Sequence, residues 1–260
     1  MTESDSSRRP GLRRSDLRRL REALTKGQAG LPAAVGPAAA PETSAPPTVA
    51  PRRTPPVAPG GDGGTIMTVC TGNICRSPMA EVLLRSALVD LGVRVHSAGT
   101  HALVDEAMTE QALQLAVAHG ADATASGDHR ARLLTRPLLT ETDLVLTMAR
   151  EHRSHVVQTM PALLHRTFTL REFARLAATL ADDEVRAGVA PAGPAAGARL
   201  QALARLIGGQ RGMVPAEPDN DDVIDPYRRS QKTYDLSASQ LVPAVGQAAR
   251  VIRAALSPGR

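Results

Sequence analysis

The stretch from Thr65 to Met79, TIMTVCTGNICRSPM, constrains the fold more than any other part of the chain. An apolar run from Ile66 to Val69 ends in Cys70, as a short buried strand would. Small and polar residues follow and suit a tight loop that turns its backbone inward. Ser77-Pro78 then begins a helix, where the missing N–H of proline costs nothing. Together these parts predict an anion-binding site, because converging N–H groups and a helix dipole supply positive potential.

Cys70 stands at the mouth of this predicted loop and Arg76 at its far end, with the spacing Cys-x5-Arg. Backbone N–H groups focused on a cysteine stabilise its thiolate form, which is the nucleophile. Arg76 offers a planar guanidinium that fits two oxygens of a phosphate. The pattern predicts phosphoryl transfer through a cysteinyl-phosphate, with Cys70 as nucleophile and Arg76 as phosphate clamp.

Length and composition bound the class of protein. A chain of 260 residues, 42% of them hydrophobic, suits one domain with appendages and an aliphatic core, since only 2% are aromatic. Both cysteines lie in the predicted loop, which excludes a disulfide-stapled secreted domain and leaves no zinc site of usual spacing. We expect no metal or other cofactor. Without a membrane-spanning run or a signal-peptide segment, we expect a cytoplasmic protein that does not insert stably into membranes.

The chain is predicted to divide into a tail and a domain. Residues 1–64, basic and rich in Pro and Ala, are expected to be a disordered N-terminal tail. They hold 10 Lys and Arg against 6 Asp and Glu, whereas residues 65–260 hold 21 against 20. The excess positive charge therefore lies in the tail and gives no support to nucleic-acid binding by the domain. Within the domain, residues of about 182–218 form a Gly/Pro-rich stretch that is predicted to be an insertion.

Strand and helix patterns alternate along the domain. The predicted strands are 66–70, 93–98, 143–148 and 167–170. The predicted helices are 78–91, 106–119, 149–159, 171–180, a short one at 199–207, and 230–256 with a disturbance at Pro243. This alternation predicts a three-layer α/β/α fold whose central sheet has four parallel strands. The phosphate-binding loop follows the first strand, at the carboxyl edge where the catalytic groups of such sheets gather.

The nine residues from Cys70 to Pro78, CTGNICRSP, closely resemble the phosphate-binding loop of the low-molecular-weight protein tyrosine phosphatases of bacterial type. The resemblance extends over about residues 65–256 but is absent from 1–64 and 182–218. It implies metal-independent hydrolysis of phosphotyrosine in proteins, because Arg76 and the loop N–H groups supply the positive field. The partners that it implies are phosphotyrosine proteins, among them a tyrosine kinase of a polysaccharide-export system.

A cysteine phosphatase also needs an acid that protonates the leaving oxygen. Four aspartates are candidates and spacing alone leaves them all open: Asp219, Asp221, Asp222 and Asp225. Asp225-Pro226-Tyr227 matches the Asp-Pro-aromatic pattern with which the family presents its general acid. The resemblance therefore assigns the role of acid, and then of base, to Asp225.

The resemblance also implies a set of supporting residues behind the loop. It assigns to Ser77 a hydrogen bond to the Cys70 thiolate, and to Asn73 the bracing of the loop through its side-chain amide. His129 matches the family histidine that bonds this asparagine, and Ser97 matches another supporting hydroxyl.

Cys75 matches a second loop cysteine, which can trap an oxidised nucleophile as a reversible disulfide. A small buried residue is the alternative. By resemblance the walls of the phosphotyrosine slot are Thr71, Leu103 and Tyr227, with smaller side chains at the first two than many relatives have, so that ring stacking is weaker. The predicted substrate-binding residues are Thr71, Gly72, Asn73, Ile74, Cys75, Ser77, Leu103 and Tyr227.

Three other interpretations stay open at this point. An arsenate reductase on the same fold normally needs a further cysteine, and this chain has two. A non-catalytic phosphotyrosine-binding relative is disfavoured because Cys70, Arg76 and Asp225 are all present. A binding protein whose role lies in the basic tail would lose that role, but no hydrolytic activity, when residues 1–60 are deleted.

Overall fold

The computed structural model describes residues 63–257, so the predicted tail lies outside the described residues except for its last two positions. Four parallel strands form one sheet in the order β2-β1-β3-β4. Their bounds are β1 (Thr65–Cys70), β2 (Arg94–Gly99), β3 (Leu144–Thr147) and β4 (Thr167–Thr169). The predicted four-stranded parallel sheet is confirmed.

Strand β1 lies between β2 and β3 and is buried along its whole length. Its side chains alternate between two cores, because successive residues of a strand point to opposite faces. Ile66 and Cys70 belong to the larger core, and Met67 and Val69 to the smaller one. The strand ends with Cys70 opposite Gly99 of β2, which places the cysteine at the carboxyl edge of the sheet.

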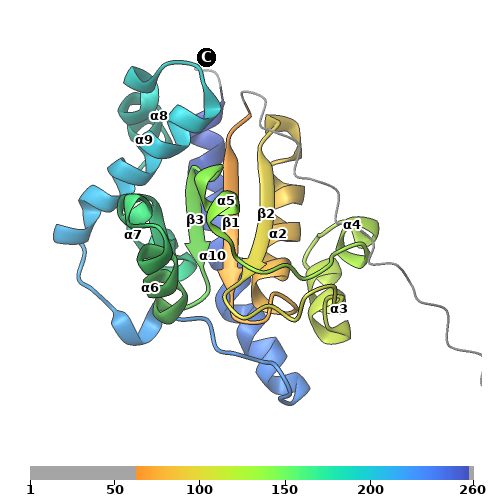
Figure 1. Cartoon of the computed structure of the whole chain (residues 1–260). Coiled ribbons are helices and arrows are strands. Elements are labelled where there is room, and N and C mark those ends of the chain that lie inside the picture. Colours follow the sequence, from red (N-terminus) through yellow and green to blue (C-terminus); the bar gives the residue numbers. More distant parts are fainter. Residues whose placement is uncertain (1–62, 258–260) are drawn as a thin grey trace, which may run out of the picture. The chain divides into compact units, whose positions relative to one another are not determined.

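Helices cover both faces of the sheet (Figure 1). The larger core is closed by α2 (Arg76–Ala87), α7 (Leu170–Ala177) and α10 (Gln231–Leu256). The smaller core lies under α5 (Arg136–Thr140), α6 (Arg150–Thr159) and the 3-10 helix η2 (Pro161–Arg166). This is the expected three-layer arrangement.

Helices α2 and α3 each lack about one predicted turn at one end. Helix α2 gives way to a 3-10 turn, η1 (Val89–Leu91), and Gly92 ends the turn with a φ of 64°. After β2, α3 (Glu110–Ala118) begins four residues later than the predicted 106, and α4 (Ala123–Gly127) follows it. The late start of α3 follows from backbone hydrogen bonds that hold residues 100–109 in an irregular, turn-containing course against the loop after β1.

The stretch 182–218 is largely helical, with more regular structure than the single short helix predicted there. It contains α8 (Asp182–Val189), η3 (Ala190–Ala192), α9 (Ala196–Gly209), η4 (Gln210–Gly212) and the start of η5 (Pro218–Asn220). Both α-helices pack against α10. Gln201 of α9 donates to Asp143, which directly precedes β3. The two helices therefore lie towards the amino edge of the sheet, opposite the edge that carries Cys70 (Figure 1).

Helix α10 runs unbroken through Pro243, where a disturbance was predicted. A proline inside a helix costs about 3 kcal/mol. Burial of each large aliphatic side chain contributes about 1.5–3 kcal/mol, and Leu241, Val245 and Ile252 are all buried while Pro243 faces solvent. The apolar face therefore keeps the helix continuous. Although α10 has 26 residues, neither it nor another helix of residues 63–257 is apolar enough to cross a membrane.

Candidate active site

The phosphate loop, residues 70–77, connects β1 to α2. Its carbonyl groups are engaged by the segment after β2, whose backbone N–H groups donate at 2.9–3.0 Å: His101 to Thr71, Leu103 to Gly72 and Thr109 to Ile74. Because these carbonyls are used on the outer side, the loop N–H groups can turn to the inner side. Asn73 N–H does so and donates to the Cys70 sulfur at 3.3 Å.

Cys70 lies at the base of this loop, with 2% of its surface exposed. Its Sγ is 2.9 Å from the Oγ of Ser77 in the first turn of α2. Positive partial charge gathers at a helix N-terminus. The loop N–H, the Ser77 hydroxyl and the start of α2 therefore all stabilise negative charge on the sulfur.

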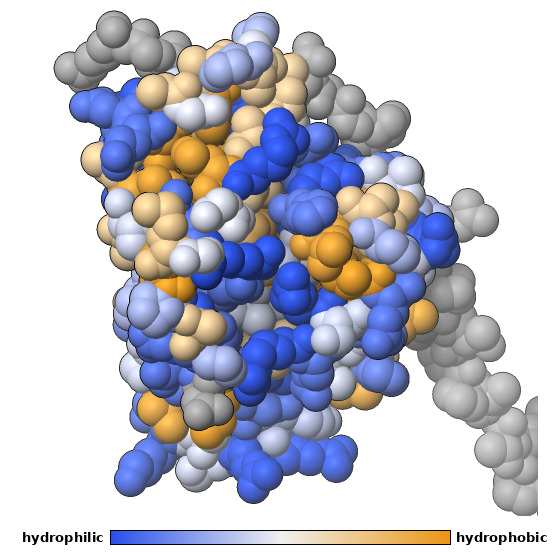
Figure 2. All heavy atoms as spheres, turned by 90° about the vertical axis from the view of Figure 1, so that its left-hand side faces the viewer, coloured by the Kyte–Doolittle hydropathy of each residue, from blue (hydrophilic) through white to orange (hydrophobic). Residues whose placement is uncertain are grey.

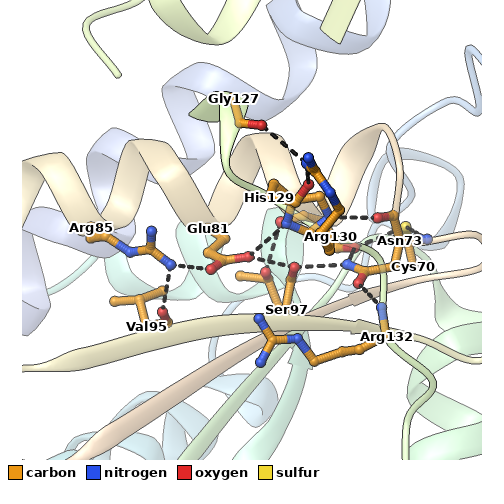
Figure 3. Close-up of polar contacts among 12 residues, drawn as sticks. Cys70, Asn73, Glu81, Arg85, Val95, Ser97, Gly127, His129, Arg130 and Arg132 are labelled. Carbon is orange, nitrogen blue, oxygen red and sulfur yellow. Dashed lines mark hydrogen bonds and ion pairs between the residues drawn. The ribbon is translucent and has the colours of Figure 1, made fainter. Parts of the chain in front are cut away.

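Asn73 is the centre of a hydrogen-bond network that fixes the direction of each proton (Figure 3). Its Nδ2 donates to Ser77 Oγ at 2.9 Å and to Ser97 Oγ at 2.7 Å. Since Ser77 Oγ accepts from Asn73, its own proton is available for the Cys70 sulfur. Ser97 in turn donates to Glu81 Oε2 at 2.6 Å. The hydrogen bonds thus run outward from the Asn73 amide along two branches, one ending at the Glu81 carboxylate and the other at the Cys70 sulfur.

The backbone of Asn73 has a φ of 57°, in the left-handed region that asparagine tolerates better than most residues. Its remaining polar groups also have partners. Oδ1 accepts the backbone N–H of Arg132 at 2.9 Å, and the carbonyl accepts from His129 Nε2 at 2.8 Å. The predicted contact between His129 and Asn73 is present, although it goes to the main chain of Asn73.

Glu81 is a member of this network that the sequence interpretation missed. It is 2% exposed, pairs with Arg85, and lies 3.5 Å from Nδ1 of His129. Burial raises the pKa of this carboxyl, but the hydrogen bonds from His129 and Ser97 and the charge of Arg85 outweigh burial and bring the pKa below its ordinary value. The signal was present in the sequence: a carboxylate four residues after Ser77 falls on the same helix face.

Arg76 lies at the far end of the phosphate loop and is 4% exposed. Its Nη1 donates to the carbonyl of Val223 at 3.1 Å, and its Nη2 pairs with Asp225 Oδ2 at 2.7 Å. Its Nε is buried and has no partner among the described residues. An unsatisfied buried donor is costly, and a phosphate oxygen in the cavity would satisfy it.

The acid loop, residues 221–229, carries Asp225 to the phosphate loop. Arginines hold the amino end of this loop: Arg175 pairs with the Asp221 carboxylate at 3.1 Å, Arg171 donates to the Asp222 carbonyl at 2.9 Å, and the Arg150 backbone donates to Asp222 Oδ1 at 2.8 Å. Of the candidate acids, Asp221 and Asp222 are thus engaged elsewhere. Asp225 contacts Arg76, with 52% of its side chain exposed.

A cavity of about 150 Å³ opens between the two loops. Its lining residues are Cys70, Thr71, Gly72, Ile74, Cys75, Arg76, His101, Leu103, Asp225 and Tyr227. The structure brings together the predicted nucleophile, clamp, acid and walls, and adds His101. Asn73 and Ser77, predicted to bind substrate, lie behind the loop instead. Larger cavities occur among the described residues, and one of them shares Arg76 and Asp225 with this cavity, but Cys70 lines only this one of the three.

Three further side-chain contacts involve residues of the phosphate loop. Thr71 Oγ1 lies 2.9 Å from Nε2 of the buried His152, a partner that was not predicted. Cys75 Sγ lies 3.4 Å from Thr109 Oγ1 and 3.5 Å from Tyr234 OH. Burial raises the pKa of the Cys75 thiol, and it raises that of Tyr234 to about 12. Both cysteines are free thiols, and a disulfide between them stays a prediction.

A family model described as low molecular weight phosphotyrosine protein phosphatase matches residues 65–185. The chain is 41% identical over 108 residues, 42% of its length and 71% of the relative's, to the probable low molecular weight protein-tyrosine-phosphatase EpsP of Ralstonia nicotianae. It is 34% identical over 110 residues, 42% of its length and 71% of the relative's, to a protein-arginine-phosphatase of Bacillus subtilis.

Among solved structures, the YwlE arginine phosphatase from Geobacillus stearothermophilus matches 72% of this chain and 90% of its own, with a TM-score of 0.50 and 24% identity. That likeness concerns the fold alone, and it agrees with the sheet described above. The sequence identity to curated phosphatases decides the family. As its sequence predicts, the chain belongs to the low molecular weight phosphotyrosine protein phosphatases, which are cysteine-dependent phosphatases.

Proposed function

We propose that this phosphatase hydrolyses phosphotyrosine in proteins, with Cys70 as nucleophile, Arg76 as phosphate clamp and Asp225 as general acid and base. One observation carries the proposal. A buried sulfur, a guanidinium with a buried unpartnered N–H and a carboxylate meet at one cavity of about 150 Å³. A phosphate group needs a nucleophile, a cationic clamp and a proton donor in this arrangement.

In the first step the Cys70 sulfur attacks phosphorus, a sulfur–phosphorus bond forms, and the bond from phosphorus to the tyrosine oxygen breaks. Asp225 gives its proton to the departing phenolate oxygen. Without substrate Asp225 pairs with Arg76. An entering phosphate takes over the guanidinium, which releases Asp225 to hold the proton that the leaving group requires.

In the second step water attacks the phosphocysteine. The sulfur–phosphorus bond breaks and the electron pair returns to Cys70, while Asp225 accepts a proton from the water. The N–H of Asn73 and the hydroxyl of Ser77 stabilise the sulfur anion as it departs. Inorganic phosphate then leaves the cavity.

The walls of the cavity favour an aromatic leaving group. Ile74, Leu103 and Tyr227 present apolar or aromatic surface to it, and such surface packs against a phenyl ring. Phosphoarginine is the competing substrate to test, because one relative is named an arginine phosphatase. Its leaving group is a guanidine. Among the described lining residues Asp225 alone is a carboxylate, and the reaction uses it as the acid, so none of them is left to pair with a guanidinium.

We propose a phosphotyrosine protein as the natural partner, with the tyrosine kinase of a polysaccharide-export system as the first to try. We further propose that residues 65–260 are one phosphatase domain in which about 182–218 is an insertion. The family match ends at residue 185, and the acid loop follows the two extra helices.

The test compares turnover of matched phosphotyrosine and phosphoarginine peptides by the full chain in the presence of a chelator. We expect kcat/KM to favour phosphotyrosine at least about tenfold, a ratio that one good wall contact supplies. Quenching during turnover should trap a phosphocysteine. Cys70→Ser should lower kcat by at least about 10⁴-fold, as loss of a nucleophile does elsewhere, and should leave no trapped phosphate. Preference for phosphoarginine, or turnover that survives Cys70→Ser, would refute the proposal.

A further inference from the structure

A second cavity, of about 490 Å³, lies between η2 and α9. Its lining residues are Ala162, His165, Arg166, Gln201, Ala204, Arg205, Gly208, Gly209 and Arg211. The volume is in the range of small-molecule sites. Residues 201–211 of its wall fall beyond the family match, so the cavity depends on the extra helices. Arg166 bonds the carbonyl of Thr142 before β3, which places the cavity at the amino edge of the sheet.

The side chains that line the cavity carry a net positive charge. Three arginines and a histidine line it, whereas none of its described lining residues is an Asp or Glu. Two carboxylates contact its lining and offset part of this positive charge. Glu172 pairs with Arg211 at 2.8 Å, and Asp143 accepts from Gln201 at 2.7 Å and from the Thr65 backbone at 2.9 Å. Figure 2 looks onto the side that carries α7 and α9, where hydrophilic surface runs between hydrophobic areas.

Some hydrogen-bond donors of the cavity have no partner among the described residues, and one other is held in a fixed position. Arg205 is exposed, and it has no hydrogen bond or ion pair with any described residue; the same is true of His165. Arg211 is held in place because its guanidinium lies 4.4 Å from the centre of the Phe168 ring. Fixed guanidinium groups bind oxyanions at a low entropic cost.

The positive charge of Arg211 also affects the pKa of the neighbouring Arg153. Burial lowers the pKa of Arg153, the charge of Arg211 lowers it further, and Glu172 offsets only part of the effect. Arg153 and Arg211 both donate to the carbonyl of Thr167. An anion in the cavity would relieve this repulsion between like charges.

We propose that this cavity binds a small anion that carries a diphosphate group, as in pyrophosphate or a nucleoside diphosphate. Two linked phosphates can span the three guanidinium groups better than a single phosphate does. Arg205 has all its donors available among the described residues, whereas Arg166 and Arg211 keep those not already bonded to Thr142, Thr167 and Glu172. The wall along α9 consists of Ala204, Gly208 and Gly209, whose small size leaves room beside the charged rim. The site is separate from the phosphate loop and does not rest on the proposed reaction.

The test is calorimetric titration of the full chain with pyrophosphate, in an Arg76→Ala background that weakens competition from the phosphate loop. We expect one binding event there, and inorganic phosphate should bind at least tenfold more weakly. Arg205→Ala and His165→Ala should each weaken pyrophosphate binding, the first at least tenfold, and Arg205→Lys should lose less. The matched control is Arg186→Ala on α8, an exposed arginine that pairs with Asp183 outside the cavity, and it should change nothing.

Circular dichroism of each variant checks that it folds, and Arg205 is exposed, so its replacement leaves the core intact. Titration with ADP should reproduce the pyrophosphate result, because the diphosphate group is the part recognised. Absence of pyrophosphate binding in the Arg76→Ala background would overturn the proposal. So would binding that Arg205→Ala leaves unchanged, or that Arg186→Ala weakens equally.

Discussion

The two loops that face each other across the active-site cavity are stabilised in opposite ways. In the phosphate loop, Asn73 is fully buried and every polar group that it has finds a partner. In the acid loop, arginines hold the amino end, but the Asp225 side chain is half exposed and has one ion pair with Arg76. The difference separates two tasks: the nucleophile is in place before substrate arrives, while the acid must exchange partners during the reaction.

The contacts of the phosphate loop also contribute more free energy than those of the acid loop. A buried polar group that loses its partner costs about 1–3 kcal/mol, whereas an exposed ion pair contributes about 0–1 kcal/mol. Changes in the phosphate loop should therefore reduce stability and activity together. Changes in the acid loop should reduce activity and leave stability nearly unchanged.

Apart from loss of the nucleophile itself, the largest effect is expected for Asp225→Asn. Loss of general acid catalysis should lower kcat for aryl phosphates by about 10²–10³-fold, while the free energy of unfolding changes by no more than about 0.5 kcal/mol. The measurement is kcat against pH together with urea unfolding. Asp222→Asn is the matched control, because Arg150 holds that carboxylate away from the cavity. Wild-type activity of Asp225→Asn at every pH would show that the acid is misassigned.

Asn73→Ala should lower stability by about 3 kcal/mol, because it removes the donor to the buried oxygens of Ser77 and Ser97 and the acceptor of the Arg132 N–H. It should also lower kcat. Asn73→Gly loses the same bonds but accepts the left-handed φ, so it should be about 1 kcal/mol more stable than Asn73→Ala. Urea unfolding of the three proteins measures both differences. An Asn73→Ala protein as stable as wild type would remove the basis of the comparison between the loops.

The stability of the buried part of the domain should also depend on pH. His96 on β2 is buried, both of its ring nitrogens lack a partner among the described residues, and burial lowers its pKa to about 4. The unfolded chain, with a pKa of about 6.5, binds the proton more readily, so stability is present above that pH and is lost as the pH falls towards 4. His96→Gln should reduce this loss by about 1–3 kcal/mol in unfolding curves measured from pH 7 to 4. The control, His119→Gln at an exposed position of α3's end, should keep the wild-type slope.

The smallest effect is expected at the anchor of the acid loop. Arg175→Ala frees the Asp221 carboxylate and should lower kcat/KM about three- to tenfold by loosening the loop that carries Asp225. Arg175→Lys should recover part of the loss. Steady-state kinetics measure both, with Arg186→Ala as the control on α8. Equal losses in Arg175→Ala and Arg186→Ala would mean that the anchor has no specific role.

The sequence predicted best those parts of the site whose residues lie close together along the chain. The chemistry of Cys70 and Arg76 follows from one strand–loop–helix stretch, and Asp225 from a three-residue pattern. Glu81 could have been found, because it lies one helical turn after Ser77 on the helix that the loop begins. His152 could not, because its contact with Thr71 depends on how α6 packs next to the loop after folding. The sheet was predicted from apolar runs, whereas α9 was underestimated because its Ala and Gly residues give a weak apolar period.

The extra helices lie at the edge of the sheet opposite Cys70 (Figure 1). A bulky phosphorylated protein can therefore approach the catalytic mouth without meeting them. In a parallel sheet of this kind, the carboxyl edge carries the reactive groups and the amino edge can accept inserted segments. Fluorescent tags or affinity peptides grafted between α8 and α9 should for that reason leave the approach of a macromolecular substrate unobstructed.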